Sequence, residues 1–80
     1  FELLWNTLNR TDMMVLAGMS SSGLSPLSDE FNRQFGTGAA STVYSTLQRL
    51  VKKGMVIKEG TSYFIDDPFF ERWLRARRRA

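Results

Sequence analysis

The chain has 80 residues, enough for one small domain, and 42% of them are hydrophobic, which is too many for a disordered tail. It contains no cysteine and no histidine, so disulfides, thiolate metal sites and histidine-based acid–base chemistry are excluded. The net charge is +3, and much of the positive charge lies near the C-terminus, at Arg72, Arg75, Arg77, Arg78 and Arg79.

The first ten residues carry an apolar face at helical spacing, formed by Phe1, Leu4, Trp5 and Leu8. We expect residues 1–10 to form a leading helix from a missing upstream domain, because the chain opens in the middle of this apolar pattern. If the face does not fold onto the rest of the domain, it forms an exposed interaction strip. Two copies of the chain would then form a homodimer through it.

A second helix is predicted after this segment, with Asn9 or Thr11 as the capping residue and Asp12 in the first turn. The side chains expected to face the core are Met13, Leu16 and Ala17. The run Gly18–Gly23, GMSSSG, is small and polar, which predicts a loop.

A third helix is predicted to start at Ser25–Pro26, with Ser25 as the N-cap and Pro26 in the first position, and to end at Gly36. A short glycine-bearing turn leads into Ala39–Gly54, AASTVYSTLQRLVKKG, which has strong helical periodicity. The apolar side of this fourth helix is Ala40, Val43, Leu47, Leu50 and Val51. Gly54 is expected to end the helix, and its N-cap is Thr37, Gly38 or Ser41.

After Gly54 the pattern alternates, which predicts a hairpin over 55–65 with its turn at 59–61. One strand is expected to place Met55 and Ile57 on one face, and Val56 and Lys58 on the other. The returning strand places Tyr63 and Ile65 on a common face. Asp67–Pro68 predicts the start of a last helix over 67–79, with a buried stripe of Phe69, Phe70, Trp73 and Leu74.

The order of elements indicates one mainly α domain with a small antiparallel β-hairpin. Two helices joined by a short turn over 25–53, followed directly by the hairpin at 55–65, predict a winged helix-turn-helix spanning residues 1–80.

Several residues form a more specific pattern: a helix ending in leucines and Lys-Gly, a tyrosine-containing strand, and an Asp-Pro-aromatic-aromatic start to a tryptophan-bearing helix. They are Leu47, Leu50, Lys53, Gly54, Tyr63, Asp67, Pro68, Phe69, Phe70 and Trp73. From Ser25 to Arg75 the chain resembles the C-terminal winged-helix domain of prokaryotic, archaeal-type P-loop ATPases of the AAA/STAND kind. The resemblance implies an auxiliary domain that docks on the ATPase domain upstream in the same chain. No G-x-x-x-x-G-K-[ST] motif is present in these 80 residues, so they are not expected to hydrolyse ATP.

The outer side of the 39–54 helix carries short hydroxyl side chains followed by cations, a pattern that suits the major groove of double-stranded DNA. The candidate nucleic-acid contacts are Ser41, Thr42, Ser45, Arg49, Lys52 and, on the wing, Lys58. The alternative is the ordinary solvent-exposed side of an amphipathic helix. Likewise, the C-terminal arginine cluster is either a phosphate clamp or a solvated helix end.

Two classes of function follow from these patterns. One is a DNA-binding winged helix, either the C-terminal module of an ATPase or a free-standing transcriptional regulator. The other is a regulatory or protein-interaction domain without nucleic-acid contact. We expect no catalytic residue, metal or cofactor in these residues. No apolar run approaches the roughly 20 residues of a membrane span and no signal peptide is visible, so a cytoplasmic protein without membrane contact is expected.

Overall fold

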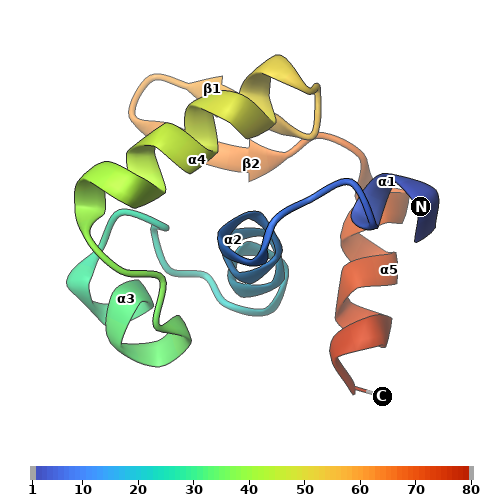
Figure 1. Ribbon diagram of the computed structural model, residues 1–80, viewed down its shortest axis with the longest axis horizontal. Coiled ribbons are helices and arrows are strands. Elements are labelled where there is room, and N and C mark those ends of the chain that lie inside the picture. The colour runs from blue at the N-terminus through green and yellow to red at the C-terminus, as the bar shows by residue number, and fades with distance from the viewer. Residues whose placement is uncertain (1, 80) are drawn as a thin grey trace.

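Helix α2 (Arg10–Ser21) runs through the middle of the molecule, and the other elements surround it (Figure 1). The computed structural model describes residues 2–79, with the side chains of residues 2–77. In chain order the remaining elements are α1 (Glu2–Trp5), α3 (Asp29–Phe35), α4 (Ala40–Lys52), β1 (Val56–Glu59), β2 (Ser62–Ile65) and α5 (Pro68–Arg79). None of these helices is long and apolar enough to cross a membrane. The predicted fold class, mainly α with an antiparallel hairpin, is confirmed.

Helix α2 begins with a reciprocal cap. The side chain of Asn9 accepts a hydrogen bond from the Asp12 amide at 2.8 Å, and the Asp12 carboxylate accepts one from the Asn9 amide at 3.2 Å. The loop predicted over Gly18–Gly23 is wrong in its first part, because α2 continues to Ser21. The hydroxyls of Ser20 and Ser21 donate to the carbonyl of Ala17, so these small polar residues are satisfied within the helix.

Gly18 lets α3 lie against α2. A Cβ atom at this position would stand 2.4 Å from Cζ of Phe31 and 2.9 Å from Cδ2 of Phe35. Phe31 is fully buried, and its ring lies 4.7 Å from that of Phe35, centroid to centroid. The absence of a side chain at Gly18 therefore sets how closely the two helices approach.

Helix α3 starts later than the sequence suggested. Ser25 and Pro26 form a turn, closed by the Ser28 amide donating to the Ser25 carbonyl at 3.0 Å. The N-cap is Ser28, whose Oγ accepts from the Phe31 amide at 3.1 Å. Ser25–Pro26 is thus a start signal for the turn before the helix, and the helix-turn-helix expected from residue 25 has its first helix at 29–35. Gly36, at φ 62°, ends α3 as predicted.

Helix α4 has an uncapped start and a tightly closed end. None of the three residues proposed as its N-cap serves, because the cap position is Ala39, which has no capping side chain. At the other end Gly54 adopts φ 78°, its amide donates to the Val51 carbonyl, and the Met55 amide donates to the Leu50 carbonyl. These two bonds form a Schellman motif, so the prediction that Gly54 closes the helix is confirmed.

The apolar side of α4 is rotated slightly from the expected one. Its buried members are Val43, Leu47, Leu50 and, unexpectedly, Thr46. Ala40 and Val51 are exposed, contrary to the prediction, because they lie at the edge of the helix away from α2.

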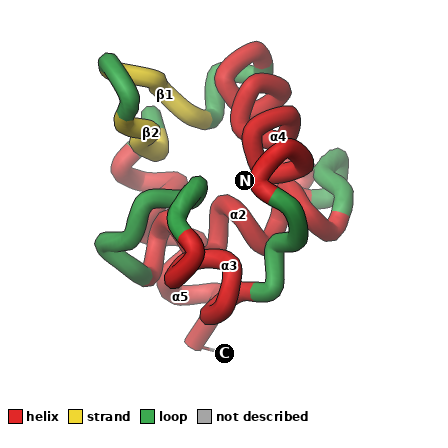
Figure 2. The backbone as a smooth tube through the Cα atoms, turned by 90° about the vertical axis from the view of Figure 1, so that its left-hand side faces the viewer, coloured by secondary structure: helices red, strands yellow, loops and turns green. Residues whose placement is uncertain are grey.

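The hairpin pairs β1 with β2 in an antiparallel register, from Val56 opposite Ile65 to Glu59 opposite Ser62. It lies beside α4, as Figures 1 and 2 show from two directions. The prediction that Met55 and Ile57 share a face is wrong: Met55 and Val56 are both buried, at 4% and 3% exposed, whereas Ile57 is 39% exposed. Tyr63 and Ile65 do share a face, and both pack against the core.

Helix α5 begins with the predicted cap. The Asp67 carboxylate accepts from the Phe69 amide at 2.8 Å, and Pro68 occupies the first helical position. Phe70 and Leu74 are buried, and Trp73 is partly buried. Phe69 was expected in the same stripe but points outward and is 67% exposed.

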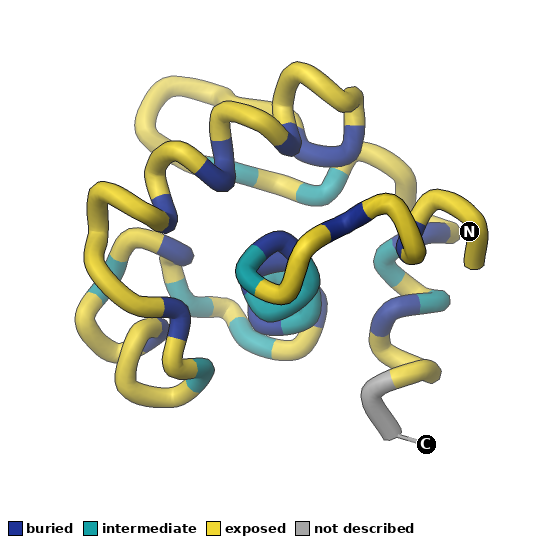
Figure 3. The backbone as a smooth tube through the Cα atoms, viewed as in Figure 1, coloured by how far each residue is buried: buried dark blue, intermediate teal, exposed yellow. Residues whose placement is uncertain are grey.

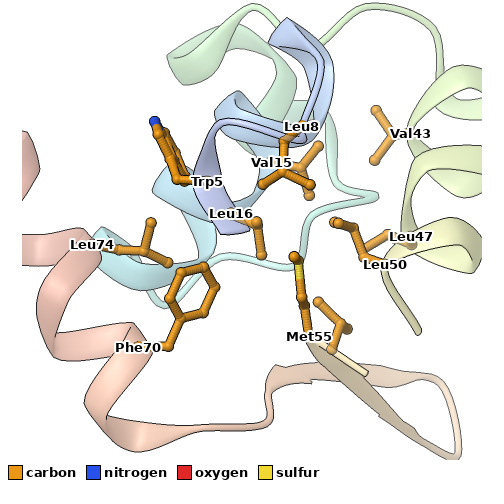
Figure 4. Close-up of a cluster of buried hydrophobic side chains, with 11 residues drawn as sticks. Trp5, Leu8, Val15, Leu16, Val43, Leu47, Leu50, Met55, Phe70 and Leu74 are labelled. Carbon is orange, nitrogen blue, oxygen red and sulfur yellow. The ribbon is translucent and has the colours of Figure 1, made fainter. Parts of the chain in front are cut away.

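One apolar cluster joins α1, α2, α4, β1 and α5 (Figure 4). Figure 3 shows that the buried positions of α4 and α5 lie on the sides turned towards α2. Trp5 and Leu8 belong to this cluster, at 8% and 6% exposed, so the four N-terminal residues do not form a continuous exposed strip. Leu4 is 40% exposed, and Phe1 lies outside the described residues.

Arg77 of α5 contacts α1 and so links the N-terminal and C-terminal helices. The guanidinium of Arg77 lies 5.5 Å from the ring centroid of Trp5 and 5.2 Å from that of Trp73, and it forms an ion pair with Glu2 at 3.1 Å. The two indoles meet edge to face at 5.7 Å. The packing of α1 on α5 therefore combines aromatic, cation–π and ionic contacts.

Candidate nucleic-acid interface

The outer side of α4 and the hairpin border a groove of about 660 Å³. Its polar and aromatic lining comes from α4, through Tyr44, Ser45, Gln48, Arg49 and Lys52, and from the hairpin, through Lys58 and Tyr63. The helix contributes one side because its buried residues, Val43, Leu47 and Leu50, face the core and leave its polar side outward. The hairpin contributes the other because the Schellman motif directs the chain straight from α4 into β1.

The structure brings four of the six candidate contact residues together at this groove. They are Ser45, Arg49, Lys52 and Lys58. Ser41 and Thr42 are exposed on the first turn of α4, beyond the groove but on the same helix. All six residues are thus accessible, on one helix and the wing beside it.

Arg49 differs from the other candidates because it is already paired. Its Nη2 donates to Asp12 Oδ1 at 2.6 Å, and Nη2 also lies 3.5 Å from the Thr46 hydroxyl. The Asp12 side chain is 3% exposed, whereas that of Arg49 is 47% exposed. The pair links α4 to the first turn of α2 and supplies the buried carboxylate with a charged partner.

The two lysines of the groove have more freedom. Lys52 lies in the last turn of α4, where a cation is favourable to the helix dipole. Lys58 lies directly across the hairpin from Tyr63, with its Nζ 5.8 Å from the centroid of that ring. This distance allows a weak cation–π contact at an exposed site.

The charge of this region is more one-sided than the net charge of the chain. Between Glu30 and Glu59 the sequence contains no acidic residue. The same stretch, which holds the end of α3, all of α4 and most of β1, carries the cations Arg33, Arg49, Lys52, Lys53 and Lys58. A helix and its adjoining wing therefore share a surface of positive charge.

The arrangement of α2, α3, α4 and the hairpin is that of a winged helix, and a family model agrees with it. The model described as "Probable winged helix domain" matches residues 1–76. The chain belongs to this winged-helix family. No curated protein and no solved structure matches it. The family's description names a fold and no parent protein, so the link to an ATPase is a proposal.

In this winged-helix domain α4 is the second helix of the helix-turn-helix and the β1–β2 hairpin is the wing. The groove also contains Tyr44, Gln48 and Tyr63, which were not among the candidate contacts selected from the sequence; Tyr44 is 42% exposed. The acid-free stretch from 31 to 58 was visible in the sequence and would have pointed to the region. The partner of Arg49 was not, because Asp12 lies 37 residues earlier.

The C-terminal arginine cluster is largely engaged within the domain where it is described. Nε of Arg75 donates to the Ser20 carbonyl at 2.8 Å, and Nη2 of Arg75 pairs with Glu71 at 3.0 Å. Arg77 lies against the two tryptophans, and Arg72 is exposed. The side chains of Arg78 and Arg79 lie outside the described residues. Among the residues that are described, no three carboxylate side chains converge closely enough to hold a metal ion.

Proposed function

We propose that this winged-helix domain is a non-catalytic module that binds double-stranded DNA, with α4 in the major groove and the wing along the neighbouring backbone. The observation that carries the proposal is the set of exposed cations on α4 and β1, which lie in a stretch without an acidic residue between Glu30 and Glu59. DNA presents a dense row of phosphates, so a surface on which accessible lysines outnumber carboxylates attracts it by releasing condensed counterions.

The residue types on α4 support entry into a groove. Ser41, Thr42 and Ser45 have short side chains, so the helix can approach closely, and their hydroxyls can bond phosphates or base edges. Lys52 and Lys58 stand on the two sides of the groove between helix and wing. They would contact phosphates on either side of the base edges that α4 faces.

The test is fluorescence anisotropy with a pool of random duplexes, beginning at about 50 mM salt, where phosphate contacts are strongest. We expect binding that weakens steeply as salt rises. Lys52→Ala and Lys58→Ala should each lower the slope of log affinity against log salt by about one. Arg72→Ala is the matched control, because it removes an exposed cation from α5, away from the groove.

Two results would contradict the proposal. One is the absence of binding to any duplex at low salt. The other is an equal loss for Arg72→Ala and the two lysine variants, which would move the contact to the C-terminal arginine cluster or to unspecific charge.

A second candidate function is docking on another protein domain, and the exposed side chain of Phe69 favours it. In the Asp-Pro-Phe-Phe segment Phe70 is buried, but Phe69 is 67% exposed at the start of α5. An aromatic side chain left in water at a helix start is suited to an interface. In the ATPase context that the sequence resemblance suggests, the partner would be the upstream nucleotide domain of a cytoplasmic protein.

Two observations test the docking proposal. The sequence upstream of Phe1 should contain a phosphate-binding loop, and its absence would end the ATPase version. In a chain that includes that domain, Phe69→Ser should weaken the contact between the two domains, while the exposed control Phe64→Ser leaves it unchanged.

Self-association through α1 would depend on Leu3 and Leu4, which are 85% and 40% exposed, since Trp5 and Leu8 are buried. Sedimentation of the wild type and of Leu3→Ser measures whether a homodimer forms through this surface.

A further inference from the structure

The ion pair between Arg49 and Asp12 is built more rigidly than a surface salt bridge. The acceptor cannot move: the Asp12 side chain is 3% exposed, and its Oδ2 accepts the Asn9 amide in the cap of α2. The Arg49 guanidinium is also constrained, because its Nη2 lies 2.6 Å from Asp12 Oδ1 and 3.5 Å from the Thr46 hydroxyl. The guanidinium is therefore fixed in orientation by the protein itself.

The rest of that guanidinium faces outward. The Arg49 side chain is 47% exposed, and it lines the groove beside Ser45 and Lys52. Among the described residues, no protein acceptor is recorded for Nε or Nη1. Nη2 carries a second hydrogen, and its contact with Thr46 is at the 3.5 Å limit of a hydrogen bond. This hydrogen and that of Nε or Nη1 can form a planar two-donor fork towards whatever enters the groove.

Fixed orientation and neutralised charge point to a different role from that of a free lysine. A carboxylate at 2.6 Å offsets most of the long-range attraction between Arg49 and a phosphate. What remains is directional hydrogen bonding, available at little cost in side-chain entropy because the rotamer is already set. Directional donors discriminate between bases, whereas diffuse charge strengthens binding to all sequences.

We propose that Arg49 is the specificity-determining residue of the DNA-binding surface, donating two hydrogen bonds to O6 and N7 of a guanine, and that Asp12 is its positioning residue. Lys52 and Lys58 supply the affinity that does not depend on sequence. This division of roles rests on the proposed function, that the domain binds double-stranded DNA.

The first test is selection of binding sites from randomised duplexes, followed by affinities for the selected site and for the same site with guanine replaced. Wild type should select a guanine at one position and prefer it by roughly 5- to 100-fold, the range of a good bidentate contact. Arg49→Lys keeps the positive charge but loses the planar fork. It should lose this preference, while its affinity for unselected DNA and its salt slope stay close to those of wild type.

Lys52→Ala is the matched control on the same helix. It should keep the guanine preference and lower the salt slope by about one. The two variants are thus expected to change opposite properties, which general damage to the fold would not do.

Asp12→Asn tests the positioning role. Asparagine keeps an oxygen that can accept the Asn9 amide but removes the charge that neutralises Arg49. The guanine preference should fall, whereas affinity for unselected DNA and the salt slope should rise. A variant that merely unfolds would lose affinity for selected and for unselected DNA alike. A thermal melt identifies an unfolded variant, and the Arg49→Lys variant then decides whether Arg49 reads the guanine.

The outcomes separate the two levels of the proposal. If no duplex binds at low salt, the DNA-binding function itself is wrong. If duplexes bind but Arg49→Lys selects the same sequence as wild type, or lowers the salt slope as Lys52→Ala does, Arg49 is not the base-reading residue and the inference is overturned.

Discussion

Replacement of Gly18 by alanine should destabilise the domain strongly for so small a change. The new Cβ would stand 2.4 Å from Cζ and 2.7 Å from Cε2 of Phe31, and 2.9 Å from Cδ2 of Phe35. Phe31 is fully buried and has no space to retreat into, so α2 and α3 must separate. Overpacking of this kind costs about 1–3 kcal/mol, and two rings within 3 Å place the cost near 3 kcal/mol.

Part of that cost is offset, because alanine is favoured over glycine inside a helix by about 1 kcal/mol. The net loss in the free energy of unfolding is therefore about 2 kcal/mol. For a domain of this size it corresponds to a fall in Tm of roughly 8–16 °C. Thermal and urea unfolding followed by far-UV circular dichroism measure both quantities.

Gly23→Ala makes the same chemical change at a position where nothing lies within 4 Å of the new Cβ, and Gly23 does not have a positive φ. It should leave stability unchanged or raise it by up to about 1 kcal/mol. A Gly18→Ala variant that unfolds at or above the temperature of wild type would show that the contact between α2 and α3 is not close packed, and the reasoning would fail.

Three further substitutions test the ends of elements. Arg77→Ala removes the cation that lies against Trp5 and Trp73, so the free energy of unfolding in urea should fall by about 1 kcal/mol. Tryptophan emission should shift as well, and unchanged emission would count against the cation–π contact. Asp67→Ala removes the N-cap of α5 and should cost about 1 kcal/mol in thermal unfolding, whereas Asp67→Ser should retain most of the stability; equal losses for both would argue against capping. Gly54→Ala forces a side chain into φ 78° with open space around it, so backbone strain alone should cost about 1–2 kcal/mol, and a neutral result would contradict the Schellman geometry.

Much of the fold could be predicted because its elements carry local signals. The spacing of Val43, Leu47 and Leu50 predicts α4, and Asp67–Pro68 marks the start of α5. These signals act within a few residues, as capping and helical periodicity do, so they survive in any context that buries one side of the helix.

The second half of α2 could not be predicted in the same way. Gly18, Ser20 and Ser21 have low helix propensity and no apolar bulk, so their sequence is typical of a loop. The serine hydroxyls are satisfied by the Ala17 carbonyl, and Phe31, from another helix, packs against Gly18 and holds this part of the chain in the helix. A tertiary contact decides the local structure here, and it is not visible in a window of residues.

The first strand was misread for a related reason. Alternation assumes that a strand is regular from its first residue. Met55 belongs to the helix-closing motif, where its amide bonds to Leu50, so both it and Val56 turn inward and the alternation starts one residue later than expected.

The candidate site was predictable only in part. Exposed cations and hydroxyls on α4 follow from the amphipathic pattern, but the contact of Arg49 with Asp12 does not, because it depends on how α2 crosses α4. It is this contact that separates Arg49 from the lysines in the proposed roles.

The junction between α4 and the wing is held by backbone hydrogen bonds on both sides. Gly54 and Met55 are both bonded to the last turn of α4, and the Met55 carbonyl accepts the amide of Asp66, where the hairpin ends. These bonds couple the orientation of the hairpin to that of α4, so the distance between them is set largely before a ligand arrives. A DNA duplex that contacts both α4 and the wing would have to bend or change its groove width to fit them. Sequences that deform easily would therefore bind more tightly, even where the easily deformed base pairs do not touch the protein.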